Sequence, residues 1–134
     1  MKYFIGQKAK FSKVITKKDV LMFSEISGDK NPIHIDETYA KTTIFKSPIV
    51  HGLLCAGLIS SVIANTLPGE GTIYLGQELK FLSPVFHNEN LTAEVEIIEI
   101  IKDKKHLILK TIVKKDNDTI VISGVARVKC YNIK

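Results

Sequence analysis

The chain has 134 residues, of which 45% are apolar and 25% are charged, and it carries a net charge of +5 at pH 7. This length fits one domain with one sizeable core, so the fold needs neither disulfides nor metal ions to be stable. The positive charges are scattered lysines without interleaved aromatic residues, which disfavours nucleic-acid binding and leaves at most a modest attraction for a polyanionic small molecule.

The chain begins with signals for a strand and a helix. Residues 8–15 alternate apolar and polar side chains and predict the first strand. Thr16 has the features of a helix N-cap, and Asp19 stands three residues later, in the first turn. The apolar spacing over residues 17–27 predicts a helix that ends at Gly28.

Residues 31–43 predict a loop that contains a short helix. Pro32 disfavours helical backbone at Asn31, so no helix is expected to run through this point. Asp36 is the simplest N-cap for the short helix that follows.

A longer helix is predicted over residues 51–66. Its apolar face is formed by Leu54, Leu58, Ile59, Val62 and Ile63. The remaining surface is kept slim by Ala56, Gly57, Ser60 and Ser61. Because the helix is nearly apolar all round, we expect it to be buried.

The second half of the chain carries strand signals. Four strands are predicted over residues 72–82, 91–100, 106–115 and 119–131, and polar turns separate the last three. Long antiparallel strands beside one buried helix predict a single α+β domain over residues 1–134, with the helix on one face of the sheet.

No segment has the pattern of a signal peptide or a membrane span. The N-terminal segment lacks a continuous apolar run, and the weakly polar residues 47–67 include His51 and Asn65. Cys55 and Cys130 lie in apolar surroundings without metal-ligand spacing. We therefore expect a cytoplasmic protein with reduced core cysteines that does not contact membranes.

The stretch SGDKNPIHID, Ser27 to Asp36, gathers two aspartates, an asparagine, a histidine and a proline within ten residues. Its spacing resembles the start of a calcium-binding EF-hand loop. Pro32 occupies the fourth loop position and His34 the sixth, where a glycine is required for the sharp turn. The calcium interpretation therefore fails.

Two further interpretations of this stretch compete with chemistry. A transition-metal site would use Asp29, His34, Asp36 and His51, but no established ligand spacing is present. Alternatively, Asp29 and Asn31 form ordinary polar turns with the local backbone.

Three features favour an enzyme. A carboxylate and an imidazole that stand five residues apart, across a rigid Asn-Pro turn, can converge on one water molecule. In PIVHGLL, Gly52 stands where the long helix begins, and the free N–H groups of a helix N-terminus can stabilise a developing enolate. The small residues of that helix leave room for a ligand. Together these features suit chemistry on an acyl thioester.

The segments FSEISGDKNPIHIDETYAKTTIFKSPIVHGLL and LPGEGTIYLGQELKFLSPVF closely resemble the (R)-specific enoyl-CoA hydratases of the MaoC-like dehydratase family. SGDxNPxHxD combined with PIVHG at this spacing is far more specific than a lone short motif. The resemblance implies a hotdog fold, in which an antiparallel sheet wraps around a long central helix. It also implies a lyase that reversibly hydrates trans-2-enoyl-CoA to the (R)-3-hydroxyacyl thioester. Neither a metal nor a redox cofactor takes part, since coenzyme A belongs to the substrate.

The resemblance also implies residue roles. Asp29 becomes the general base on water, while His34 holds that water and delivers a proton to C2. The Gly52 N–H bonds the thioester carbonyl. Asn31 is expected to fix the loop or the water molecule, and the alternative is a purely structural role in the turn. The Ser60 hydroxyl orients Asp29, unless this serine serves only helix packing. His51 is expected to be structural rather than catalytic.

Two other functions stay open. A hotdog thioesterase usually carries its carboxylate on the central helix, but residues 51–66 contain no Asp or Glu. A non-catalytic acyl-thioester binding domain would not need the pair of Asp29 and His34. The acyl chain length, the choice between CoA and acyl-carrier-protein thioesters, the direction of the reaction and the pathway, such as polyhydroxyalkanoate supply, stay open. A homodimer or higher homo-oligomer is expected.

Overall fold

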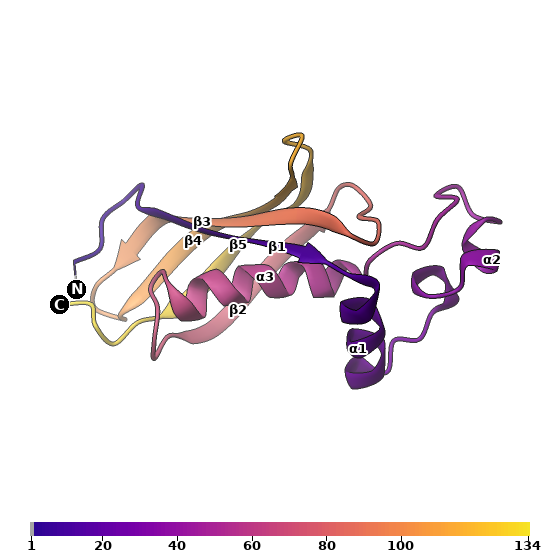
Figure 1. Cartoon of the computed structure of the whole chain (residues 1–134). Coiled ribbons are helices and arrows are strands. Elements are labelled where there is room, and N and C mark those ends of the chain that lie inside the picture. Colours follow the sequence, from indigo (N-terminus) through magenta and orange to yellow (C-terminus); the bar gives the residue numbers. More distant parts are fainter. Residues whose placement is uncertain (1) are drawn as a thin grey trace.

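The computed structural model describes residues 2–134 as a five-stranded antiparallel sheet with a long helix along one face (Figure 1). The elements in chain order are β1 (Lys8–Ile15), α1 (Lys17–Ser27), the 3₁₀ turn η1 (Pro32–His34), α2 (Glu37–Ala40), α3 (Gly52–Asn65), β2 (Ile73–Phe81), β3 (Glu89–Ile101), β4 (His106–Lys115) and β5 (Ile120–Lys129). The predicted α+β hotdog arrangement, with α3 as the central helix, is confirmed.

The sheet has the strand order β1-β3-β4-β5-β2, so β1 and β2 form its edges. Strand β3 shows the side-chain alternation on which its prediction rested. Leu91, Ala93, Val95 and Ile97 are fully buried, and the polar residues between them face away from the core. Local register shifts interrupt the ladder between Ile97 and Glu99, between Tyr74 and Gly76, and between Val113 and Lys114, and such irregularities bend and twist a sheet.

Helix α3 packs against β1, β3 and β4. Its buried side chains are Cys55, Leu58, Ile59, Val62 and Ile63. The expectation that the whole helix is buried is wrong for the single chain, because Leu53, Gly57 and Ser60 are exposed. The sheet covers one face of the helix, and these three residues lie on the part of its surface that stays exposed in the described chain, residues 2–134.

The local signals of the first half act as predicted. The Thr16 side chain accepts a hydrogen bond from the Asp19 N–H, and the Asp19 carboxylate accepts one from the Thr16 N–H. Gly28 ends α1 in the left-handed conformation, with φ of 81°. The Asp36 carboxylate caps α2 by accepting a hydrogen bond from the Tyr39 N–H.

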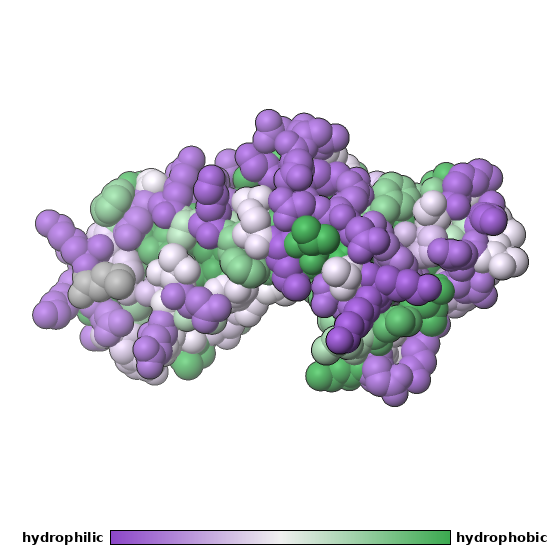
Figure 2. Space-filling model, in the orientation of Figure 1, coloured by the Kyte–Doolittle hydropathy of each residue, from purple (hydrophilic) through white to green (hydrophobic). Residues whose placement is uncertain are grey.

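The segment between α1 and α3 projects beyond one end of the sheet, whereas the C-terminus lies near the opposite end (Figure 1). The space-filling view shows the same projection, with hydrophilic and hydrophobic side chains mixed on its surface (Figure 2). The segment is attached to the sheet by a hydrogen bond of 2.7 Å from the Val50 N–H to the Val85 carbonyl and by an isolated bridge between Ile49 and Phe86. The predicted polar cluster lies in this projecting segment. Among residues 2–134, no helix has the length and apolar character needed to cross a membrane.

Candidate active site

A series of tight turns shapes the loop after α1. The Ser27 hydroxyl accepts a hydrogen bond from the Asp29 N–H at 3.1 Å, and Asp29 Oδ1 accepts one from the Asn31 N–H at 3.3 Å. Asn31 Oδ1 in turn accepts from the Ile33 N–H at 3.2 Å and caps η1. Asn31 is exposed and does not line the pocket described below, so its side chain shapes the loop here.

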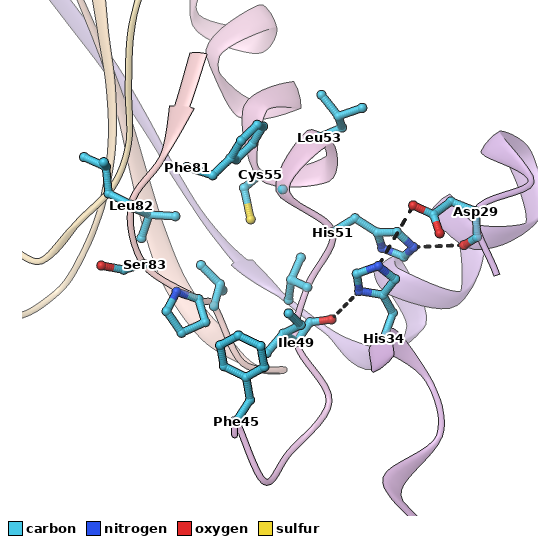
Figure 3. Close-up of a pocket in the computed structure, with 15 residues that line it drawn as sticks. Asp29, His34, Phe45, Ile49, His51, Leu53, Cys55, Phe81, Leu82 and Ser83 are labelled. Atoms are coloured by element: carbon cyan, nitrogen blue, oxygen red, sulfur yellow. Dashed lines mark hydrogen bonds and ion pairs between the residues drawn. The ribbon is translucent and has the colours of Figure 1, made fainter. Parts of the chain in front are cut away.

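The turns bring the side chains of Asp29 and His34 together (Figure 3). Asp29 Oδ2 and His34 Nε2 are 3.9 Å apart, with 50% of the Asp29 side chain and 12% of the His34 side chain exposed. This separation is too long for a direct hydrogen bond, but one water oxygen can lie within hydrogen-bond distance of both atoms.

The second ring nitrogen of His34 is already occupied. His34 Nδ1 lies 2.8 Å from the Ile49 carbonyl oxygen, which can only accept, so Nδ1 carries a proton. Any proton that His34 gains or loses must therefore move at Nε2, the atom that faces Asp29.

His51 lies directly behind this pair. Its ring stacks on that of His34, with centroids 3.7 Å apart, and only 2% of the residue is exposed. Burial lowers the pKa of His51, so the ring is neutral at pH 7. Its Nε2 is 3.1 Å from both the Asp29 carbonyl oxygen and Ser24 Oγ, and its Nδ1 is buried without a hydrogen-bond partner among residues 2–134.

The three side chains also have the composition of a metal site. One ligand atom from each of Asp29, His34 and His51 lies within 4.8 Å of the others. However, the two imidazole planes are inclined by only 26°, and the lone pair of an imidazole nitrogen lies in its ring plane. Lone pairs on stacked rings run side by side and do not converge on one ion at about 2.0 Å. The geometry suits a water molecule better than a metal ion, and Asp36 is not part of the group.

The cluster opens into an apolar cavity of about 520 Å³. Besides Asp29, His34 and His51, its walls include Phe45, Ile49, Val50, Cys55, Phe81, Leu82, Val85 and Val121. In Figure 3, Phe81 and Leu82 lie across the pocket from the polar cluster, on the β2 side. Such a site has polar groups at one end and room for an aliphatic chain beside them.

Gly52 also lines this cavity, at the first position of α3. A helix leaves its first N–H groups without intrahelical acceptors, and no hydrogen bond among the described residues uses the Gly52 N–H. A side chain here would meet Phe81, since an ideal Cβ on Gly52 would lie 2.5 Å from Phe81 Cε1 unless the ring moved.

The structure does not bring Ser60 to this cluster. Its side chain is exposed on α3, eight residues beyond Gly52, which corresponds to about 12 Å along the helix axis.

Two residues of the site have no counterpart in the sequence predictions. Ser24 lies on the buried face of α1, where a serine in an apolar stripe is a recognisable signal. His87 donates from Nε2 to the His34 carbonyl oxygen at 2.9 Å. It lies in a turn far along the chain, and no sequence pattern connects it with the loop.

Known proteins resemble this chain over most of its length. A family model described as "MaoC like domain" matches residues 2–119. The (R)-specific enoyl-CoA hydratase of Aeromonas caviae is 43% identical over 125 residues, which cover 93% of each chain. A 3-hydroxybutyryl-CoA dehydratase from Methylorubrum extorquens is 39% identical over 93% of this chain and 79% of its own. The solved structure of an (R)-hydratase from A. caviae, involved in PHA biosynthesis, superimposes with a TM-score of 0.92 at 42% identity, covering 95% of this chain and 96% of that one.

Proposed function

This chain belongs to the MaoC-like dehydratase family, and we propose that it is an (R)-specific enoyl-CoA hydratase, a hydro-lyase that adds water reversibly to trans-2-enoyl-CoA. One observation carries the proposal at the level of the site. The facing atoms of Asp29 and His34, and the free N–H of Gly52, border the same apolar cavity. Hydration of a conjugated thioester requires these three elements together.

Asp29 and His34 act on one water molecule. The 3.9 Å gap between Oδ2 and Nε2 accommodates a water that donates to Asp29 and accepts from protonated His34. As the water oxygen attacks C3, Asp29 takes its proton, and His34 Nε2 delivers a proton to C2. The proton on Asp29 then returns to Nε2, which resets the pair and balances the reaction. Throughout the reaction, His34 Nδ1 keeps its own proton and donates it in a hydrogen bond to the Ile49 carbonyl oxygen.

The Gly52 N–H stabilises the negative charge that develops on the thioester carbonyl oxygen. Attack at C3 moves electrons through the conjugated system onto the carbonyl oxygen, which becomes enolate-like. An N–H at the start of α3, supported by the positive end of the helix dipole, stabilises this oxygen. The apolar cavity walls strengthen that interaction by excluding water.

The reaction needs neither a redox cofactor nor a metal ion, because every proton comes from water and the substrate brings its own coenzyme A. Activity should therefore survive exhaustive treatment with a chelator. The same chemistry applies to an acyl-carrier-protein thioester. Comparing the hydration rates of the CoA thioester and the acyl-carrier-protein thioester shows which of the two substrates the enzyme prefers.

Crotonyl-CoA provides the test. Loss of the enoyl absorbance without release of free thiol, with (R)-3-hydroxybutyryl-CoA as product, supports hydration. Thiol release indicates a thioesterase, and neither signal indicates a binding domain. We expect Asp29→Asn and His34→Ala to lower kcat by roughly 10²–10⁴, the usual contribution of a positioned acid or base. The matched controls are Asp103→Asn and His106→Ala, at the opposite end of the sheet, and they should retain full activity. Near-wild-type turnover in either site variant contradicts the assignment.

The active form is a homodimer or a higher homo-oligomer. Leu53, Gly57 and Ser60 form an exposed stripe on an otherwise apolar helix, and the edge strand β2 exposes Ile73 and Leu75. Exposed apolar surface next to an open sheet edge is typical of an interface. Because Ser60 lies on this stripe, its hydroxyl faces the proposed interface and is available to a partner subunit. Analytical ultracentrifugation tests this state, and a monomer at micromolar concentration contradicts it.

A further inference from the structure

We propose that His51 and His87 are positioning residues, each of which holds the backbone carbonyl of one member of the catalytic pair. His51 holds Asp29 and His87 holds His34. The inference rests on the proposed function, in which Asp29 and His34 act on water.

The hydrogen bond from His51 has a defined direction. A carbonyl oxygen only accepts, so the 3.1 Å contact between Nε2 and the Asp29 carbonyl requires the proton on Nε2. The same N–H also lies 3.1 Å from Ser24 Oγ on α1. Because His51 is itself the residue before α3, it links α1, the loop and the start of α3 at one point.

His87 holds the other end of the loop in the same way. Its Nε2 lies 2.9 Å from the carbonyl oxygen of His34, which again only accepts. His87 sits in the turn immediately before β3, so this contact fastens the loop to the sheet.

Besides these two attachments, the loop is held by its own turns and by the hydrogen bond from His34 Nδ1 to the Ile49 carbonyl. Asp29 is half exposed, and among residues 2–134 its carboxylate accepts one hydrogen bond, from the neighbouring Asn31 N–H. The segment projects beyond the sheet (Figure 1). A displacement of about 1 Å in a catalytic group can cost roughly 10²-fold in rate. Two hydrogen bonds to the carbonyls on either side of the Asn-Pro turn limit that displacement.

The test separates the hydrogen-bond donor of each histidine from its aromatic ring. His51→Phe and His87→Phe remove the N–H, whereas His51→Gln and His87→Gln supply an amide N–H near the position of Nε2. His106→Phe on β4 is the matched control. We expect each phenylalanine variant to lower kcat roughly 10- to 100-fold on crotonyl-CoA, with KM changed by less than about threefold. Each glutamine variant should recover most of the lost turnover.

A second measurement separates positioning from general damage. If His51 acts through Asp29, His51→Phe should lower the residual rate of Asp29→Asn by less than about threefold, since the group that it positions is already disabled. His87→Phe in the His34→Ala background should behave alike. If His51→Phe does not fold, the His51→Gln and His87→Phe variants carry the test.

Hydrogen exchange makes the outcome independent of activity. Amides of residues 29–34 should exchange faster in the phenylalanine variants, while those of β3 and β4 stay protected. A wild-type protein without hydratase activity overturns the proposed function, and exchange then decides whether the loop is held as we infer. The inference itself is overturned by unchanged exchange, by an undiminished kcat in the phenylalanine variants, or by glutamine variants that lose as much turnover as the phenylalanine variants. It is also overturned if His51→Phe lowers the rate as much in the Asp29→Asn background as in the wild type.

Discussion

Gly52→Ala should strongly lower hydration activity and leave the fold nearly as stable as before. The Gly52 backbone is not in the left-handed region, so alanine is conformationally allowed there. The three nearest atoms all belong to the Phe81 ring and would lie 2.5, 2.6 and 3.3 Å from the new Cβ. Ordinary contact begins near 3.4 Å, so the ring must retreat by about 0.9 Å.

The stability terms nearly cancel. Phe81 is 54% exposed, so its ring can turn towards solvent, at a cost of about 0.5–1.5 kcal/mol for a less favourable side-chain conformation. Replacing glycine at a compatible position returns about 0.4–1 kcal/mol through the unfolded state. The free energy of unfolding should therefore change by no more than about 1 kcal/mol.

The loss of activity is not offset by an opposing effect of this kind. The new methyl group and the displaced ring both stand at the end of the cavity where the Gly52 N–H must meet the thioester oxygen. Losing one oxyanion donor typically costs about 10²–10³ in kcat. We expect crotonyl-CoA hydration to fall by roughly 10²-fold in kcat/KM, measured from the enoyl absorbance.

The same helix offers a matched control. Gly57→Ala adds the same methyl group where no atom of another element among residues 2–134 lies within 4 Å. Because Gly57 lies on the exposed stripe, the variant is first compared with the wild type by sedimentation, and a variant with the wild-type oligomeric state should keep wild-type activity. The double variant Gly52→Ala/Phe81→Leu shortens the clashing side chain and tells whether the ring or the methyl group obstructs the N–H. Wild-type kcat/KM in Gly52→Ala would refute the reasoning that the methyl group and the displaced Phe81 ring obstruct this N–H.

Three further predictions concern stability and reactivity. Burial lowers the pKa of His51 below its ordinary 6.5. Below pH 6.5 the imidazole of the unfolded chain therefore binds a proton that the folded protein does not bind, and the free energy of unfolding decreases as the pH falls. Thermal melts from about pH 7 to about pH 5 should show a smaller decrease in Tm for His51→Gln, and equal slopes contradict the assignment. Gly124→Ala would place a Cβ 1.8 Å from the Glu78 carbonyl oxygen, a backbone atom that moves only if β2 and β5 separate. It should lower the free energy of unfolding by about 3 kcal/mol in urea titrations, and a wild-type midpoint would exclude so close a strand contact. Burial raises the pKa of the Cys55 thiol to about 12, so iodoacetamide at about pH 8 should leave Cys55 unmodified until the protein is unfolded, and rapid labelling of the native protein contradicts its burial.

The sequence alone predicted the elements well because their signals are local. Thr16 and Gly28 mark the ends of α1, and the alternation along β3 marks both a strand and its buried face. The loop from Ser27 to Asp36 was recognised because its turn-forming residues and its reactive groups are neighbours in the chain. Local sequence therefore carries both the shape of the loop and its chemistry.

The remaining features depend on distant contacts, which no local pattern encodes. His87 reaches the loop across 53 residues, and only the packing of the β2–β3 turn beside η1 brings it there. The exposed stripe of α3 was missed for a related reason. Apolar composition shows that a helix face becomes covered, but it does not show whether the same chain covers it. Ser60 lies on that stripe and away from Asp29.

The start of α3 links the two ends of the proposed chemistry. His51 fixes the Asp29 carbonyl, and the next residue, Gly52, presents the N–H for the thioester oxygen. Since one peptide unit separates these roles, any shift of the helix terminus displaces the oxyanion donor and the general base together. Substitutions at the two positions should therefore not be additive, because each displaces both groups relative to the bound thioester, on whose geometry the attack at C3 depends.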